Sequence, residues 1–288
     1  MKKLGVLLIC GLLLAGCSSP KFTSQVTDGS KTIVSNEKIK ITKQEYYEYL
    51  LETYGSDQVL DEALKYISEK EVTDQKEIDK LVKERSKTYA QYSEGGLGEY
   101  AKSMGYKDEK EYQEQVIVPS VKQELLRKKY INEHYEDLMK EFNVCAIKKI
   151  VVEKESTALT VIKNSKNATE FDKLMKTYGE KAEDCGIVTK NSTSLDENLV
   201  KKISDFSKVT KDGVYKDAVK LSDDTYAVIF IYNTNHKKNK ANYQDSLSND
   251  ENITETIQSY YLKKYGFTIN EENIKNGIKE ISDKYVNN

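Results

Sequence analysis

Apolar residues recur every three or four positions from Ile41 to Phe142, and this spacing limits the fold more than any other feature of the chain. Residues spaced in this way lie on one face of an α-helix. Thr42 and Glu45 form a capping box that begins the first predicted helix, and Gly55 is expected to end it. Four further helices are expected over 60–67, from Asp74, within 95–105, and from Asp108 past Pro119 to Phe142. This part of the chain is therefore predicted to be an α-helical module.

The pattern changes near Asn143, where short runs of β-branched residues appear. The run "VCAIKKIVV" at 144–152 is typical of a strand, and it precedes two helical stretches, "STALTVIKNSK" and "ATEFDKLMKTYG". A loop is expected at Cys185 and Gly186, followed by a helix around "DENLVKKISDF" and strands at "GVYKDAVKL" and "TYAVIFIYN". The order β-α-α-β-α-β-β predicts a compact α+β unit, so the fold class of the chain is predicted to be α+β.

After Asn235 the stretch "HKKNKANYQDSLSNDEN" is predicted to be a polar linker. Two helices are expected to follow it. The first carries Ile253, Ile257 and Tyr261 on one face, and the second has Asn270 as its N-cap and presents Ile274, Ile278, Ile281 and Tyr285. These apolar faces need a partner, and the only large helical partner is the N-terminal module. The two ends of the chain are therefore expected to pack together around an inserted α+β domain.

The N-terminus has the layout of a secretory signal peptide, with Lys2 and Lys3 before a short apolar run that ends at Cys17. The tetrad "LAGC" at 14–17 resembles the bacterial lipobox, which implies cleavage before Cys17 and acylation of its thiol. The alternative is an ordinary signal peptide with a chance cysteine. Residues 18–31 are rich in Ser, Thr, Gly and Lys and are predicted to be a flexible tether. We expect a chain held by lipid on the extracytoplasmic face of the membrane.

Charge and composition exclude several functions. Loss of Lys2 and Lys3 with the signal peptide shifts the net charge from −2 to about −4, which disfavours nucleic-acid binding. The only histidines, His134 and His236, lie outside the α+β unit, and no Cys/His cluster has metal-ligand spacing, so no metal and no cofactor are expected. Cys145 and Cys185 remain in the mature chain. They could form a disulfide outside the cytoplasm or stay as two free thiols.

Three stretches carry a family resemblance: "VSNEKIKITKQEYY" at 34–47, "AIKKIVVEKESTALTVIKNSKNATEFDKLMKTYGE" at 146–180, and "KDGVYKDAVKLSDDTYAVIFIYN" at 211–233. In this order behind a lipobox, they resemble the PrsA-type foldases, lipoproteins of Gram-positive bacteria that assist the folding of secreted proteins. That family shares its helical module and its parvulin-type domain with the SurA chaperones. The resemblance implies a peptidyl-prolyl isomerase fold for the inserted domain.

The resemblance also shows where this chain departs from the family. Parvulins usually carry a histidine in the first strand, where this chain has Lys149, and another in the last strand, where it has Ala227. A cysteine or aspartate usually follows the second helix, where this chain has Lys181, unless a loop shift brings Asp184 there. A proline pocket could retain Leu199 and Ile203, four residues apart on one helix; plain core packing explains that pair equally well.

These residues favour a catalytically degenerate parvulin-like domain. The predicted parts are a lipoprotein signal peptide at 1–16, a lipidated tether at 17–32, a helical chaperone module at 33–143, a parvulin-like domain at 144–235, and a linker with C-terminal helices at 236–288.

The predicted function is a membrane-anchored foldase or chaperone whose partners are unfolded or partly folded secreted proteins. Its 21 tyrosines and lack of tryptophan suit a promiscuous binding surface, although most tyrosines are expected in cores. An active peptidyl-prolyl isomerase is the alternative. A solute-binding lipoprotein is a further alternative, but it needs two α/β lobes that this chain does not show. A cradle of helices is compatible with a homodimer.

Overall fold

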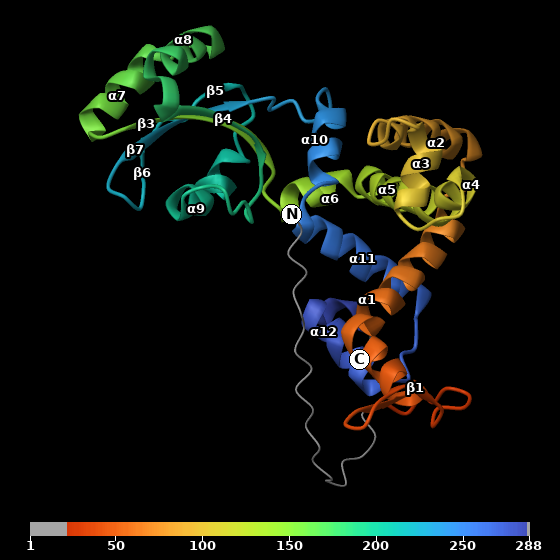
Figure 1. The fold of residues 1–288 in the computed structure, drawn as a ribbon. Helices are drawn as coiled ribbons and strands as arrows, with labels where there is room; N and C mark the ends of the chain where they lie inside the picture. The colour runs from red at the N-terminus through yellow and green to blue at the C-terminus, as the bar shows by residue number, and fades with distance from the viewer. Residues whose placement is uncertain (1–21, 287–288) are drawn as a thin grey trace. The chain divides into compact units, whose positions relative to one another are not determined.

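The computed structural model of the chain describes residues 22–286, so Cys17 lies outside the described residues. The described chain consists of helices, one small antiparallel sheet and a two-stranded hairpin, which confirms the predicted α+β class (Figure 1). The chain divides into two compact units. The smaller comprises the described residues of Met1–Ala63 together with those of Gly266–Asn288, and the larger comprises Leu64–Tyr265.

The smaller unit begins with a hairpin of β1 (Thr32–Ser35) and β2 (Lys40–Thr42), which leads directly into α1 (Lys43–Glu71). The predicted capping box is present at this junction. The backbone N–H of Thr42 donates to Oε2 of Glu45 over 2.6 Å, and the N–H of Glu45 donates to Oγ1 of Thr42 over 3.2 Å. Two backbone donors that the first helical turn would leave unpaired are thereby satisfied.

Gly55 does not end this helix, contrary to the sequence prediction, and the second predicted helix at 60–67 is part of α1. The reason lies in α12 (Glu272–Ile281), which approaches α1 closely. A Cβ atom added at Gly55 would lie 2.3 Å from Cδ1 of Ile274, and one added at Gly277 would lie 2.1 Å from Oγ of Ser56. Oγ of Ser56 donates to the carbonyl of Ile274 over 3.2 Å. The two glycines therefore allow close helix packing rather than a turn.

The C-terminal helix is confirmed, with differences at its ends. Ile274 and Ile278 are buried as predicted, and Tyr285 is buried in a 3₁₀ turn (Asp283–Tyr285), but Ile281 is 46% exposed. Asn270 is not the N-cap; Glu271 holds that position.

The predicted tether differs in its described part. Phe22 is buried, and the hydroxyl of Thr23 and the N–H of Ser24 donate to Glu271 over 2.7 and 2.6 Å. Hydrogen bonds from Ser24 and Thr23 lower the pKa of Glu271 to about 2. From Phe22 onward the chain is therefore held against the C-terminal helix.

The larger unit contains the remaining N-terminal helices. After the end of α1 come α2 (Gln75–Ala90), α3 (Gly96–Ser103), α4 (Glu109–Tyr112), a π-helical turn (Gln113–Ile117), α5 (Val118–Glu133) and α6 (Tyr135–Glu141). Asp74 and Asp108 cap α2 and α4 as predicted, since their carboxylates accept backbone N–H groups of the first turns. Pro119 directly follows the π-helical turn, and because α4, this turn and α5 are continuous, its missing N–H removes one helical hydrogen bond.

Part of the predicted linker after Asn235 is a helix, α10 (Lys240–Leu247). Tyr243 and Leu247, one turn apart, have no exposed surface, so two apolar anchors suffice to fold a stretch that is otherwise polar. The next helix, α11 (Glu251–Tyr265), buries Ile253, Ile257 and Tyr261 as predicted. Both α10 and α11 contact α5, and α12 lies against α1. The expectation that the two ends of the chain pack together is therefore confirmed.

The sheet has the strand order β4-β3-β7-β5, with β6 also paired to β7, and every pairing is antiparallel. Its strands are β3 (Cys145–Val152), β4 (Ala182–Val188), β5 (Gly213–Val214), β6 (Val219–Lys220) and β7 (Tyr226–Tyr232). The predicted strand at 213–221 is thus two short strands. Cys185 and Gly186 lie in β4 rather than in a loop. They coincide with a register shift against β3, where Gly186 adopts a φ of +67°.

Helices cover both faces of this sheet. On one side lie α7 (Glu155–Asn164) and α8 (Ala168–Tyr178), and on the other lies α9 (Glu197–Phe206) (Figure 1). Alternate residues of β3 and β7 point to the two faces and build two separate cores. The core on the α7/α8 face contains Ile150 and Phe230, and the core on the α9 face contains Ile147 and Ile229.

Within residues 22–286, no helix combines the length and the apolar character that crossing a bilayer requires. In the same residues, no group of three or more His, Cys, Asp or Glu side chains is arranged to hold a metal ion.

Candidate functional site

The α9 face of the sheet carries Lys149, the residue that stands where the family resemblance implies a histidine. It lies two residues from both Ile147 and Val151 in β3, so its side chain shares their face of the sheet and points toward α9. Its ammonium lies 2.7 Å from Oε2 of Glu183 on β4, and only 19% of the side chain is exposed. Lys149 is therefore a paired cation, which can neither accept a proton nor act as a neutral donor in the way imidazole does.

The two other substituted positions offer no such chemistry either. Ala227 pairs with Val151 in the β3–β7 register and is fully buried, so it contributes a methyl group to the core. Lys181 lies just before β4, is 60% exposed, and has its ammonium 3.5 Å from Oε1 of Glu153. The structure thus brings Lys149 and Ala227 to one sheet face on neighbouring strands, whereas Lys181 remains exposed beyond the end of a strand.

Asp184 is the alternative to Lys181 that the sequence left open. It pairs with Lys148 in the register, and its carboxylate accepts from the hydroxyl of Tyr232 over 2.7 Å. Tyr232 packs against the core on the α7/α8 face. Burial, together with the hydrogen bond to Asp184, raises the pKa of Tyr232. Asp184 therefore interacts with residues on the α7/α8 face of the sheet, opposite to the α9 face that carries Lys149.

Leu199 and Ile203 lie in the core on the α9 face of the sheet. Both side chains have no exposed surface, and both pack in the α9-face core against strand residues such as Ile147 and Ile229. This burial favours core packing, the second of the two interpretations that the sequence allowed. A prolyl ring can reach neither side chain in this conformation.

Cys145 and Cys185 do not form a disulfide and are both free thiols. Cys145 pairs with Val188, three residues along β4 from Cys185. Three residues of a strand span about 10 Å, whereas a disulfide needs Cα atoms less than about 7 Å apart. Burial raises the pKa of Cys145 to about 12 and that of Cys185 to about 11. Both thiols are therefore unreactive at neutral pH.

A feature that the sequence analysis did not single out lies in the helical part of the larger unit. Five tyrosines from α2, α3, α4 and their connections pack ring against ring, and we call them the tyrosine cluster: Tyr89, Tyr92, Tyr100, Tyr106 and Tyr112. The rings of Tyr89 and Tyr100 are stacked with centroids 5.7 Å apart, and Tyr106 meets Tyr112 edge to face at 5.0 Å. Burial raises the pKa of Tyr112 to about 12. Tyr92, by contrast, is 67% exposed.

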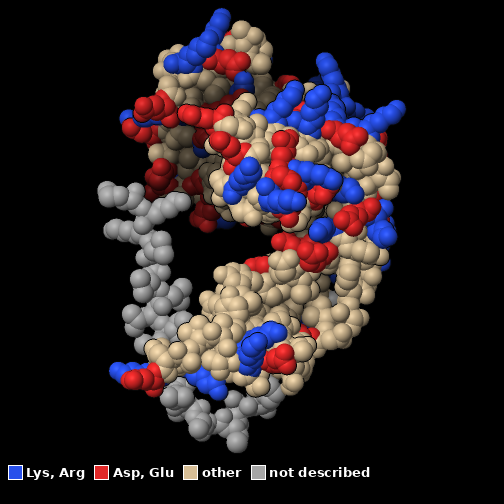
Figure 2. Space-filling model, turned by 45° about the vertical axis from the view of Figure 1, so that its right-hand side comes forward, with Lys and Arg blue, Asp and Glu red and all other residues tan. Residues whose placement is uncertain are grey.

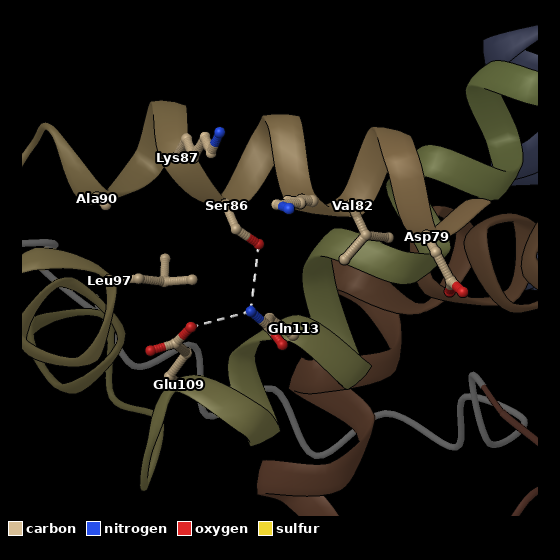
Figure 3. Close-up of a pocket in the computed structure, with 9 residues that line it drawn as sticks. Asp79, Val82, Ser86, Lys87, Ala90, Leu97, Glu109 and Gln113 are labelled. Atoms are coloured by element: carbon tan, nitrogen blue, oxygen red, sulfur yellow. Dashed lines mark hydrogen bonds between the residues drawn. The ribbon is translucent and has the colours of Figure 1, made fainter. Parts of the chain in front are cut away.

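The same three helices enclose a groove of about 470 Å³, which we call the α2–α4 groove. Figure 3 shows Val82 and Leu97 facing its space from different helices, with Gln113 joined by hydrogen bonds to Ser86 and Glu109. The Nε2 group of Gln113 donates to Oγ of Ser86 over 3.2 Å and to Oε1 of Glu109 over 3.0 Å. The remaining lining residues are Asp79, Lys83, Lys87 and Ala90. The groove therefore combines apolar walls with polar groups that can pair with a peptide backbone.

An ion-pair network holds α2 against α5 and so fixes one wall of the groove. Arg85 on α2 donates to Oγ of Ser120 over 2.8 Å and forms an ion pair with Glu124 on α5. Partial burial would raise the pKa of Glu124, but Lys128 and Arg85 together hold it below its ordinary value. The carboxylate stays charged at neutral pH, so the link persists there. On the face drawn in Figure 2, basic and acidic side chains are interspersed over these helices.

Comparison with known proteins gives structural matches only. No family model matches this chain, and no curated protein matches it. Foldase protein PrsA from Streptococcus pneumoniae is similar over 89% of this chain and 100% of its own, at 19% identity and a TM-score of 0.38. A peptidylprolyl isomerase (PrsA) from Bacillus cereus is similar over 88% and 99%, at 17% identity and a TM-score of 0.46. PrsA from Bacillus subtilis is similar over 91% and 100%, at 22% identity and a TM-score of 0.38. The resemblance to PrsA-type foldases inferred from the sequence is thus confirmed as a similarity to PrsA structures at low identity.

Proposed function

We propose that this chain is a lipid-anchored extracytoplasmic folding factor that holds unfolded or partly folded secreted proteins. Its parvulin-like domain, over 144–235, is proposed to be catalytically degenerate. The observation that carries this proposal is the α2–α4 groove, which is lined by both apolar and polar side chains and is built from the same helices as the tyrosine cluster. Anchoring is proposed to occur through Cys17, which rests on the lipobox-like tetrad at 14–17.

The chemistry of this surface suits weak binding of extended, partly apolar segments. A tyrosine ring offers a broad apolar face and a hydroxyl that can bond to a peptide group or to water. Tyr92 presents such a ring to solvent, and Val82 and Leu97 add aliphatic contacts in the groove. Chains that emerge unfolded expose segments of this composition and aggregate through them. A shallow site that binds weakly delays aggregation and still releases its client to fold.

Catalysis of X-Pro isomerisation is not expected from the sheet. The reaction has a barrier of about 18–20 kcal/mol, and an isomerase must hold the prolyl ring while favouring the twisted amide. Lys149 is engaged by Glu183, and Ala227 has no polar group. Leu199 is fully buried and so offers no wall for a prolyl ring. The ion pair of Lys149 and the burial of Ala227 and Leu199 support the proposal that this face lacks the preorganised polar network of an isomerase.

The test is a refolding reaction whose slow phase is limited by a native cis-proline, in which both rate and soluble yield are recorded. The chain from Ser18 onward is added to it. We expect the yield to rise while the rate of the slow phase stays the same. Replacing Tyr92 and Val82 by serine should lower the gain in yield. Tyr54→Ser is the matched control, because Tyr54 is 58% exposed and lies outside the groove.

Each outcome decides a different point. A faster slow phase would make the chain an active isomerase and would refute the degenerate domain. An unchanged yield would refute the chaperone function. A yield that falls equally with Tyr54→Ser would move the binding surface away from the α2–α4 groove.

A further inference from the structure

The β1–β2 hairpin presents an apolar surface that the rest of the described chain does not cover. All residues from 31 to 40 are exposed, and among them Ile33, Val34 and Ile39 are 51%, 55% and 55% exposed. In the described residues, the two strands pair only with each other. Isolated two-stranded hairpins are marginally stable in water, and clustered exposed aliphatic side chains mark a binding surface.

Hydrogen bonds fix the base of this hairpin to the start of α1. The N–H of Lys43 donates to the carbonyl of Lys31 over 2.8 Å. The side chain of Gln44 accepts from the N–H of Val26 over 3.1 Å and donates to the carbonyl of Ser24 over 3.2 Å. The turn is held as well, because Oδ1 of Asn36 accepts two backbone N–H groups over 2.7 and 2.8 Å. The hairpin therefore keeps a defined shape without covering its apolar residues.

The same contacts place the hairpin near the proposed membrane anchor. Ser24 lies at the base of the hairpin, and six residues lie between it and Cys17. Even fully extended, the seven steps from Cys17 to Ser24 reach no more than about 25 Å. Acyl chains on Cys17 would therefore keep the hairpin within about that distance of the lipid headgroups.

The charges around the apolar residues fit a negatively charged lipid surface. Four lysines lie on or beside the strands, against two acidic residues in the same stretch: Lys31, Lys38, Lys40 and Lys43, with Asp28 and Glu37. This local excess of positive charge contrasts with the net charge of −2 for the whole chain. Aliphatic residues flanked by lysines are typical of segments that lie in a membrane interface, where the long lysine side chains reach the phosphates.

We propose that the β1–β2 hairpin lies on the surface of a membrane that contains anionic lipids. Ile33, Val34 and Ile39 enter the interfacial region, and the neighbouring lysines meet the headgroups. This second membrane contact would orient the smaller unit, whereas acyl chains alone leave a chain free to rotate. The proposal rests on the proposed anchoring at Cys17 for its proximity to the bilayer.

The chain contains no tryptophan, so Val34→Trp creates a single reporter of the hairpin environment. The acylated protein carrying this substitution is reconstituted in vesicles of phosphatidylglycerol and phosphatidylcholine. We expect its emission to shift to the blue and to be quenched by brominated acyl chains. Leu159→Trp is the control, because Leu159 is 52% exposed on α7, far from the hairpin in sequence, and its emission should not change.

A second arm uses the chain from Ser18, which keeps every described residue and has no acyl chain. Flotation with the same vesicles measures the partition of the hairpin itself. Serine at Ile33, Val34 and Ile39 together should weaken partition by about tenfold or more, since three interfacial aliphatic side chains are lost. Glutamine at Lys31, Lys38 and Lys40 should weaken it several-fold at low salt and have little effect at high salt.

The two arms separate this proposal from the anchoring that it assumes. If the acylated protein floats with vesicles but the tryptophan at position 34 is not quenched, the anchor stands and the hairpin contact is refuted. If the unacylated chain floats with anionic vesicles and the serine variant does not, the contact stands whatever happens at Cys17. If the serine variant turns a dimer into a monomer and leaves flotation unchanged, a second copy of the chain covers the hairpin, and the proposal is overturned.

Discussion

Glu71 is the centre of an ionic network that joins three helices of the larger unit, and its neutralisation should destabilise that unit. Its carboxylate lies 2.6 Å from the ammonium of Lys129 on α5, forms an ion pair with Lys264 on α11, and accepts from the hydroxyl of Tyr265 over 3.1 Å. Only 10% of the Glu71 side chain is exposed. Hydrogen bonds from Lys129 and Lys264 lower its pKa from 4.5 to about 2.

The size of the effect follows from this shift. Each pKa unit corresponds to about 1.4 kcal/mol, so the lowered pKa of Glu71 gives an upper value of about 3 kcal/mol for the charged form. Lys129 and Lys264 are 38% and 46% exposed, and screening of their charges by water reduces this to about 1–2 kcal/mol. Glu71→Gln should lower the free energy of unfolding at pH 7 by that amount.

The pH dependence has a defined sign. Because the pKa of Glu71 is lowered in the folded chain, its stabilisation is complete above the unfolded value of 4.5 and is lost as the pH falls toward 2. Urea unfolding followed by circular dichroism at pH 7 and at pH 2.5 measures both ends of this range. The two chains should differ in free energy of unfolding at pH 7 and nearly converge at pH 2.5.

Glu69→Gln serves as the control for this comparison. Glu69 lies on the same helix two residues earlier and is exposed, so its neutralisation should change the free energy of unfolding by less than about 0.5 kcal/mol. Equal losses for Glu69→Gln and Glu71→Gln would refute the reasoning. A deficit of Glu71→Gln that stays the same at pH 2.5 would refute it too, because the effect would then not come from the charge.

Three further predictions concern packing and thiols. Gly55→Ala should destabilise the smaller unit by about 1–3 kcal/mol in urea unfolding, because its methyl group would meet a side chain of α12 at 2.3 Å. Gly98→Ala, whose Cβ would meet nothing within 4 Å, should instead stabilise α3 by about 0.5–1 kcal/mol, and a loss there would contradict the packing argument. Tyr243→Ala should lower the melting temperature, because loss of this fully buried side chain should reduce the free energy of unfolding by about 3–5 kcal/mol. A small change would contradict the burial of Tyr243 and would favour the polar linker that the sequence predicts. Cys145 and Cys185 should react with a thiol reagent only after unfolding, and reduction should leave the mass of the unmodified chain unchanged.

The parts of the fold that depend on neighbouring residues were predictable from the sequence. Asp74 and Asp108 cap helices through their own side chains, and Thr42 and Glu45 pair across three residues. The apolar face of α11 was visible because a helix brings positions three and four residues apart together. Such signals involve residues within about one helical turn of each other, so they can be recognised without knowing which elements the helix packs against.

The predictions that failed depended on residues far away in the sequence. Gly55 lies inside α1, and Ile274, more than two hundred residues later, occupies the space where a Cβ atom at position 55 would lie. The helix around Tyr243 forms although its own sequence is polar, because that side chain is buried in the larger unit. Cys185 lies in a strand because β3 pairs with it across two intervening helices. Tertiary contacts override local preference at each of these points.

The candidate site also depends on contacts between residues that are far apart in the sequence, which local sequence patterns do not predict. Leu199 and Ile203 fall on one helical face whether they line a pocket or fill a core, and periodicity cannot separate these cases. The tyrosine cluster was overlooked because its members follow no single period. They come together only where α2, α3 and α4 meet, although five tyrosines between positions 89 and 112 were a compositional signal.

Lys148 and Lys149 place two cations in the centre of β3, where both side chains are largely covered. Lys148 and Lys149 point to opposite faces, and each ammonium has a carboxylate oxygen at 2.7 Å, from Asp172 and Glu183 respectively. A lone cation at either position would carry a desolvation penalty, whereas a pair with its head near solvent is tolerated. Each pair also removes the free proton donor or acceptor that catalysis on that face would need. The same contacts that make lysine acceptable in this strand therefore support the proposal that the parvulin-like domain is catalytically degenerate and that clients bind to the helices.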